Sequence, residues 1–160
     1  MDMKKGAICL LIVTVLSLCV VNVTAASITR PTTVTHNGYA TELRSQQQPA
    51  ISLFFIANGK QIHTATVGQK VDIFGFLGVP GNPPTLIGGA TVKVYMSKDR
   101  TTWSGGVPDQ TFTNGKYPGG YHLTWTPNSA GAFYFKATFA GNSQYDPCQS
   151  SIKQITVTSG

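Results

Sequence analysis

Acidic side chains are scarce in this sequence, with six aspartates and glutamates among 160 residues. Beyond residue 26 the carboxylates lie far apart along the chain, at Glu42, Asp72, Asp99, Asp109 and Asp146. Enzymes that use acid–base or nucleophilic chemistry bring several such groups together with a base. Asp99 and Asp146 stand in turn-like contexts, where a side chain that bonds its own backbone explains the residue. The sequence therefore predicts a protein that is not an enzyme.

Metal-ligand and phosphate-binding patterns are also missing. The histidines His36, His63 and His122 lack the spacing of a zinc site. No Asp-x-Asp-x-Asp-Gly loop is present for calcium. The glycine-rich segments at 78–81 and 88–89 precede no helix that an anion could cap. We therefore expect neither a metal nor a cofactor.

Cysteine is too rare for a disulfide framework. Cys9 and Cys19 fall in an apolar N-terminal segment, which leaves Cys148 as the single thiol of the remaining chain. An unpaired cysteine in an exported protein suits an intermolecular disulfide. The alternative interpretation is a small packed side chain beside Pro147.

Basic residues outnumber acidic ones, twelve against six, but they form no run. Single, dispersed lysines do not track a phosphate backbone, which argues against a nucleic-acid partner. A moderate positive charge instead favours solubility or weak attraction to an anionic envelope.

Residues 1–26 have the pattern of a secretory signal peptide. Two lysines precede an uncharged run over residues 6–21, and Thr24-Ala25-Ala26 supplies small residues for cleavage. One alternative is a retained anchor, because the run approaches the roughly 17 residues that span a bilayer. Another is lipidation at Cys19, which is disfavoured because the preceding Leu16-Ser17-Leu18 puts a bulky residue where lipoprotein processing needs a small one. The sequence thus predicts an extracellular or cell-envelope protein that meets a membrane only through an uncleaved N-terminal segment.

Residues 27–50 are polar and show little apolar periodicity, which predicts a linker or flexible arm. Such an arm can also add a strand to a neighbouring chain. A homo-oligomer formed through this arm or through Cys148 is therefore an open alternative. Residues 51–160 form the predicted domain.

Short β-prone runs recur from residue 51 onward between clusters of glycine, proline and asparagine, a pattern typical of a β-sandwich. About seven antiparallel strands fit. The candidate runs span residues 51–57, 61–66, 71–77, 91–97, 111–113, 121–125, 133–139 and 152–158. Asn58-Gly59 marks a tight turn between the first two runs.

Alternation of apolar and polar residues assigns an inward face to several strands. Its strongest stripe is Phe133, Phe135, Ala137 and Phe139, which we expect at the centre of the core. Three further strands receive the inward sets Val92, Val94 and Met96; Tyr121, Leu123 and Trp125; and Ile155 and Val157.

Three stretches follow one another in an informative order: TVGQKVDIFG at 66–75, GATVKVY at 89–95 and TWTPNSAGAFYFKATFAGN at 124–142. Together they resemble one repeat of the immunoglobulin-like domains of bacterial and archaeal cell-surface proteins. The resemblance covers residues 51–158 and implies an all-β immunoglobulin-like sandwich that serves cell-surface structure or adhesion. Immunoglobulin-type corners often carry a tyrosine two residues before a core position. Phe133 stands at that position here, so no corner hydroxyl bond is expected.

Several aromatic rings fall outside the inward sets, and the candidates for contact among them are Tyr95, Trp103, Tyr117, Phe74 and Phe76. Exposed rings stack on sugars or anchor protein partners, so these residues form the predicted contact surface for a protein or glycan at the cell surface. The alternative for Phe74 and Phe76 is packing under the arm or a neighbouring loop. Two other functions stay open: a carbohydrate-binding module that uses Trp103 and Tyr95, and a self-assembling filament subunit.

Overall fold

The computed structural model describes residues 35–36, 39–40 and 46–160, and over this part of the chain it contains strands and no helix. Strands β1 (Thr35–His36) and β2 (Tyr39–Ala40) pair as a small antiparallel hairpin. Nothing in the described part has the length and hydropathy of a membrane-spanning helix. The predicted signal peptide at 1–26 and most of the predicted linker at 27–50 lie outside the described residues.

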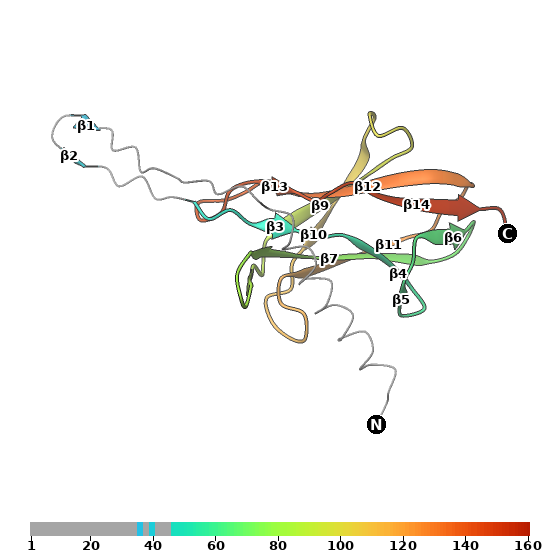
Figure 1. Ribbon diagram of the computed structural model, residues 1–160, viewed down its shortest axis with the longest axis horizontal. Coiled ribbons are helices and arrows are strands. Elements are labelled where there is room, and N and C mark those ends of the chain that lie inside the picture. The colour runs from blue at the N-terminus through green and yellow to red at the C-terminus, as the bar shows by residue number, and fades with distance from the viewer. Residues whose placement is uncertain (1–34, 37–38, 41–45) are drawn as a thin grey trace, which may run out of the picture.

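Two sheets stack face to face (Figure 1). The first, called here the β9 sheet, contains β6 (Thr64–Thr66), β9 (Thr91–Ser97), β10 (Ser104–Gln110), β12 (Gly131–Phe139), β13 (Cys148–Gln149) and β14 (Lys153–Thr158). The second, called the β7 sheet, contains β3 (Ala50–Ile51), β4 (Phe54–Ala57), β5 (Lys60–Gln61), β7 (Val71–Val79), β8 (Thr85–Leu86) and β11 (Gly120–Trp125).

The order of the strands identifies an immunoglobulin-like sandwich. The β9 sheet runs β10-β9-β12-β14-β6, and the β7 sheet runs β11-β7-β4-β5. Three strands of one sheet, β4, β7 and β11, therefore face β9, β12 and β14 of the other, which is the arrangement of that fold. Seven strands have four residues or more, as the sequence predicts. One pairing departs from the antiparallel rule, because β6 runs parallel to β14.

The predicted strand at 61–66 is divided between the two sheets. Asn58 and Gly59 both have positive φ angles, 51° and 73°, and form the tight turn predicted between β4 and β5. After Gln61 the chain leaves the β7 sheet, and β6 joins the β9 sheet beside β14. The prediction of a single partner strand is therefore wrong in its second half.

The predicted strand at 111–113 is also wrong. The chain forms its strand earlier, at β10, which pairs with β9 and shifts register between Gly105 and Val107. Thr111 is occupied elsewhere: its hydroxyl donates to the Ile87 carbonyl at 2.7 Å and accepts from the Ala90 amide at 2.9 Å. These bonds close the loop ahead of β9, and the Thr111 backbone also pairs there: its carbonyl accepts from the Gly89 amide at 2.8 Å and its amide donates to the Ala90 carbonyl at 2.9 Å.

The packed domain begins before the predicted boundary at residue 51. The Gln47 amide donates to the Gln144 carbonyl at 3.0 Å, and the Gln47 carbonyl accepts from the Asp146 amide at 3.0 Å. Pro49 is buried, and Ala50 pairs with Gly78 of β7. The end of the predicted linker is therefore part of the sandwich.

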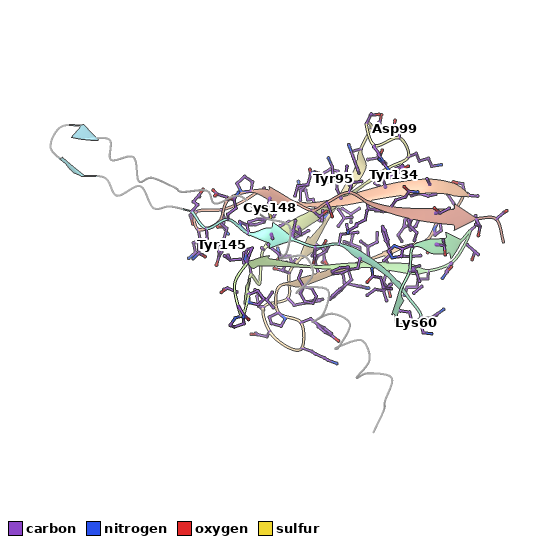
Figure 2. All side chains as sticks on the ribbon, viewed as in Figure 1. Lys60, Tyr95, Asp99, Tyr134, Tyr145 and Cys148 are labelled. Atoms are coloured by element: carbon purple, nitrogen blue, oxygen red, sulfur yellow. The ribbon has the colours of Figure 1, made fainter. Side chains whose placement is uncertain are left out.

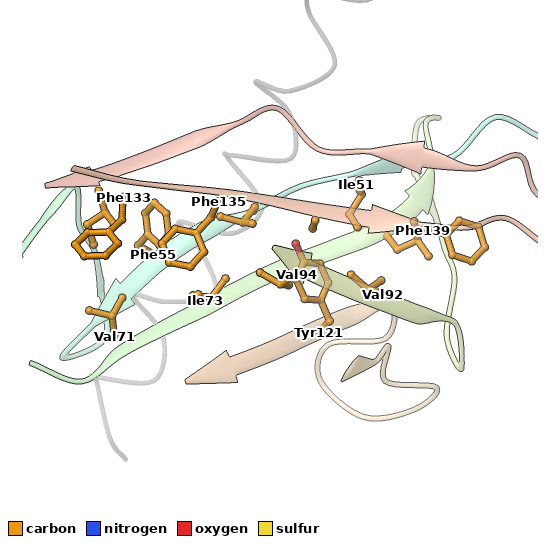
Figure 3. Close-up of a cluster of buried hydrophobic side chains, with 14 of the residues drawn as sticks. Ile51, Phe55, Val71, Ile73, Val92, Val94, Tyr121, Phe133, Phe135 and Phe139 are labelled. Atoms are coloured by element: carbon orange, nitrogen blue, oxygen red, sulfur yellow. The ribbon is translucent and has the colours of Figure 1, made fainter. Parts of the chain in front are cut away.

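The core fills the space between the sheets with the side chains that alternation turns inward (Figure 3). The predicted stripe on β12 is buried throughout, with 0–5% of each residue exposed at Phe133, Phe135, Ala137 and Phe139. Trp125 and Phe55 of the β7 sheet meet Phe135 edge to face, with ring centres 5.0 and 5.3 Å apart. Such pairs add about 0.5–1.5 kcal/mol each to the area they bury.

Tyr121 is the large polar side chain at the centre of this core, and it is fully buried. Its ring lies across Gly75 on β7, and its hydroxyl donates to the Ser52 carbonyl between β3 and β4. Burial raises the pKa of Tyr121 well above its usual range, so the hydroxyl keeps the proton that it donates. A Cβ at Gly75 would collide with both the Ser52 carbonyl and the Tyr121 hydroxyl, which explains glycine at that position.

Ser52 completes the junction by replacing a ladder bond with its side chain. Its amide donates to the Phe76 carbonyl at 2.9 Å, and its hydroxyl oxygen accepts from the Phe76 amide at 2.9 Å. The Ser52 carbonyl is thus free to accept from the Tyr121 hydroxyl. Ser52 therefore connects β11, through Tyr121, with β7, through Phe76.

The first prediction concerns this bond. Tyr121→Phe is expected to lower the free energy of unfolding by about 1–3 kcal/mol, because the Ser52 carbonyl loses its donor inside the protein. Tyr134→Phe removes a hydroxyl from the outer face of β12 and is expected to change stability by less than about 0.5 kcal/mol. Denaturant unfolding of the three proteins measures both effects. Equal unfolding midpoints for Tyr121→Phe and the unchanged protein would contradict the role given to this hydroxyl.

Candidate functional site

The five predicted contact rings separate into two groups on the outer faces of the sandwich. Tyr95 and Trp103 lie at the β9 sheet, where Tyr95 points away from the core. Phe74, Phe76 and Tyr117 gather on the outer side of the β7 sheet. The two groups belong to different sheets, so they form two surfaces.

Phe74 and Phe76 are buried, 8% and 6% exposed, so their predicted exposure is wrong. Their rings meet edge to face at 5.0 Å, and Tyr117 packs on Phe74 at 5.9 Å. The cause is the loop between β10 and β11. The Phe112 amide donates to the Gly120 carbonyl at 2.8 Å and closes the loop, and the Leu77 amide of β7 donates to the Gly119 carbonyl at 2.9 Å and holds the loop at the sheet. The alternative prediction, packing under a neighbouring loop, is confirmed for both residues. Phe112 stays 42% exposed beside them.

Trp103 and Tyr95 are half-buried and share one cation. Lys136 lies directly opposite Tyr95 in the pairing of β12 with β9. Its Nζ is 4.2 Å from the centre of the Trp103 ring and 5.9 Å from that of Tyr95. Trp103 therefore folds back over the sheet and lies against Lys136.

Gly106 makes room for this arrangement. It has a positive φ of 62°, and a Cβ at this position would lie 2.9 Å from the Tyr95 ring. The register shift in β10 at Gly105 and Gly106 thus lets the backbone pass close to Tyr95. A side chain at Gly106 would displace the ring.

Arg100 stands over a second ring of the same face. Its guanidinium carbon is 4.4 Å from the centre of the Tyr134 ring, and Tyr134 precedes Lys136 by two residues on β12. The loop that carries Arg100 is fixed by Asp99, which accepts from the Thr102 and Thr101 amides at 2.8 Å. These bonds hold the pKa of Asp99 well below its usual range. As predicted, Asp99 bonds its own turn.

Side chains at outward positions of β9 and β12, together with the adjoining loop, make up what we call the cation–aromatic face. Its members are Lys93, Tyr95, Arg100, Trp103, Tyr134 and Lys136. Figure 2 shows Tyr95 and Tyr134 together on one side of the sandwich, with Asp99 in the loop beyond them. Sequence reasoning missed the three cations and Tyr134. The signal was present as Lys93-x-Tyr95 and Tyr134-x-Lys136, but only the strand register shows that the two patterns adjoin.

Among the described residues, the cations of this face have no carboxylate partner. Within residues 46–160, eight lysines and arginines accompany four aspartates. The one ion pair found in that range joins His122 Nε2 to Asp72 at 3.3 Å, on the other sheet. The positive charges of Lys93, Lys136 and Arg100 are therefore held over rings or left in solvent rather than neutralised.

Residues suited to metal ligation do not gather in the described part of the chain: no group of three or more histidines, cysteines and carboxylates lies together there. His36, one of the three histidines, has no described side chain.

Cys148 is half-buried and packs against the core at the end of the β9 sheet. Burial raises its pKa to about 11. The thiolate is the reactive form in both alkylation and disulfide exchange. The structure therefore gives the predicted intermolecular disulfide a slow-reacting thiol.

Comparison with known proteins finds distant likenesses of shape. No protein-family model matches the chain, and no curated protein matches it in sequence. The solution structure of a CARDB domain from Pyrococcus furiosus is 16% identical with a TM-score of 0.44, and the match covers 71% of this chain and 98% of that one. The filamin domain of Lin-41 is 12% identical with a TM-score of 0.38, over 72% of this chain and 97% of that one. The strand order described above, not these likenesses, identifies the fold.

The second prediction follows from the burial of Cys148. At pH 8 its alkylation by iodoacetamide in the native protein is expected to be about two orders of magnitude slower than in the denatured chain, because a pKa near 11 leaves little thiolate. The native rate should keep rising with pH beyond pH 9, where an ordinary thiol levels off. Mass spectrometry of the peptide that contains Cys148 measures both rates. A fast native reaction, or rapid disulfide-linked dimers in air, would contradict this prediction.

Proposed function

We propose that the chain is a non-enzymatic contact module that acts outside the cytoplasm, in cell-surface structure or adhesion. The observation that carries this proposal is the cation–aromatic face, where half-exposed rings and unpaired cations share one side of the β9 sheet. An immunoglobulin-like sandwich is suited to binding or structural roles, since its sheets present broad rigid surfaces. Its function has to be argued from such a surface and not from the fold alone.

The position of the face favours binding over a purely structural role. Tyr95, Tyr134 and Lys136 stand on β9 and β12, the central strands of the sheet, whose inward residues are buried. Packing on the inner side therefore fixes the backbone under the face. A ligand would meet rings and charges that are already in place, which lowers the entropy lost on binding.

The N-terminal sequence and the charge of the domain both support an extracellular setting. A signal peptide at 1–26 remains a prediction from the sequence. The described domain carries twice as many basic as acidic side chains, and this excess attracts it to the anionic polymers of a cell envelope. Of the two other predicted functions, the filament subunit depends on residues 27–50, most of which lie outside the described residues, and it stays a prediction.

The third prediction tests this function with cell envelopes isolated from the producing cells. The purified protein is expected to sediment with the envelopes, and Trp103→Ala is expected to weaken retention roughly tenfold, in the range of an aromatic contact residue. Phe112→Ala is the matched control, because it removes an exposed ring from the other sheet. It should bind as the unchanged protein does.

Two outcomes would contradict the proposal. In the first, the unchanged protein stays in the supernatant at every envelope concentration. In the second, Phe112→Ala loses retention while Trp103→Ala keeps it, which would place the contact on the other sheet. Circular dichroism of each variant confirms that the fold is intact.

A further inference from the structure

Three cations follow one another along the cation–aromatic face. Strand pairing sets Lys136 opposite Tyr95, Thr138 opposite Lys93 and Tyr134 opposite Ser97. Arg100, over Tyr134, and Lys136 are therefore reached from β12 positions two residues apart, and Lys93 lies diagonally beyond on β9. Two residues of a strand span about 7 Å, so the charges form a row along the sheet.

The row has a single acidic neighbour in its own strands and loop. The segments at 91–103 and 131–139 contain one carboxylate, Asp99. Asp99 is occupied by the amides of Thr101 and Thr102 and by the Ser97 hydroxyl, all within 2.9 Å. The three cations thus keep their positive charge and are available to an external anion.

The rings hold the cationic groups in place. Lys136 lies 4.2 Å from the centre of Trp103, and Arg100 lies 4.4 Å from the centre of Tyr134. Such contacts restrict the side chains without neutralising their charge. An anion then finds cations whose freedom is already reduced.

The composition of the face distinguishes among anionic partners. The outward positions of β9 and β12 carry no aliphatic side chain larger than alanine: they hold Thr91, Lys93, Tyr95, Ala132, Tyr134, Lys136 and Thr138. Tyrosine, tryptophan and arginine serve protein and glycan interfaces alike, but lysine, which supplies two of the three cations of this face, is depleted in protein interfaces. Rings set among hydroxyls and cations instead suit a polymer that presents sugar faces, hydroxyl groups and negative charge.

Resting on the function proposed above, we propose that the cation–aromatic face binds an anionic polysaccharide. Carboxylate or sulfate groups of the polymer pair with Lys93, Lys136 and Arg100, and its sugar rings pack on the exposed sides of Trp103 and Tyr95. Both kinds of contact act together, so neither a neutral polysaccharide nor a polyanion without sugars satisfies the site.

Titration calorimetry with four polymers tests this inference on the purified protein. Polygalacturonate carries carboxylates and its methyl-esterified form does not, while dextran sulfate carries sulfates and dextran does not. At least one charged polymer should bind roughly tenfold or more tightly than its neutral match, and added salt should weaken that binding. If only the polygalacturonate pair shows this difference, the site recognises carboxylates; if only the dextran sulfate pair shows it, the site recognises sulfates.

Variants of the protein locate the binding surface. Lys136→Gln is expected to weaken binding of the charged polymer roughly tenfold, whereas Lys136→Arg keeps the charge and most of the binding. Lys60→Gln is the matched control, because Lys60 lies in the β4–β5 hairpin of the other sheet (Figure 2) and should leave binding unchanged.

Three results would overturn the inference. Charged polymers bind no better than neutral ones; poly-glutamate or phosphatidylglycerol vesicles bind as tightly as the charged polysaccharide; or Lys60→Gln weakens binding as much as Lys136→Gln. If envelopes retain the protein in the sedimentation experiment while no charged polysaccharide binds, the contact function stands and its ligand class is wrong. If envelopes fail to retain it, the contact function itself is wrong.

Discussion

Burial of the inner face of β12 is the constraint on which the rest of this structure depends. Phe133, Phe135, Ala137 and Phe139 are nearly inaccessible, and the residues between them must point the other way. A shift of register by one residue would bury Lys136 and expose three phenylalanines, so the packing energy of the stripe fixes the strand. The same alternation places Tyr134 and Lys136 on the outer surface, and the site is therefore a consequence of the core.

The β7 sheet depends on a buried hydrogen bond as well as on packing, and Tyr121 donates that bond. The sequence predicts no hydroxyl bond at the corner before β12, and Phe133 there is indeed part of the core. A tyrosine hydroxyl is nonetheless used on β11, where it reaches past Gly75 to the Ser52 carbonyl. The bond needs three residues at once: a tyrosine, a glycine with no Cβ, and a serine whose side chain takes over a ladder bond. It ties β11 to the segment between β3 and β4 on the inner side of the sheet.

Much of the fold could be predicted because alternation is a local signal. It gave the inward faces of β9, β11, β12 and β14, all of which the structure confirms. It failed at β10, where Gly105, Gly106 and Pro108 have low strand propensity and an edge strand with a bulge tolerates them. It failed for Phe74 and Phe76 because the loop that covers them lies more than thirty residues further along the chain. A local pattern cannot predict a contact between segments so far apart in the sequence.

The candidate site was only partly predictable for a related reason. Tyr95 and Trp103 could be found as rings outside the inward sets, but Lys136 and Arg100 join them only through the pairing of β9 with β12 and the fold of one loop. The register of two strands that lie forty residues apart is a property of the whole sheet.

The scarcity of carboxylates explains why cations meet rings on this surface. Residues 46–160 hold four aspartates against eight basic side chains, Asp72 and Asp99 are already engaged, and no ion pair in this range includes Lys136 or Arg100. A ring restrains a cation through its quadrupole and leaves the net charge intact, whereas a carboxylate would cancel it. An incoming anion consequently has no internal salt bridge to break. A domain poor in acids can in this way keep its positive surface charge while the packing of β12 and the hydroxyl bond of Tyr121 hold the sandwich together.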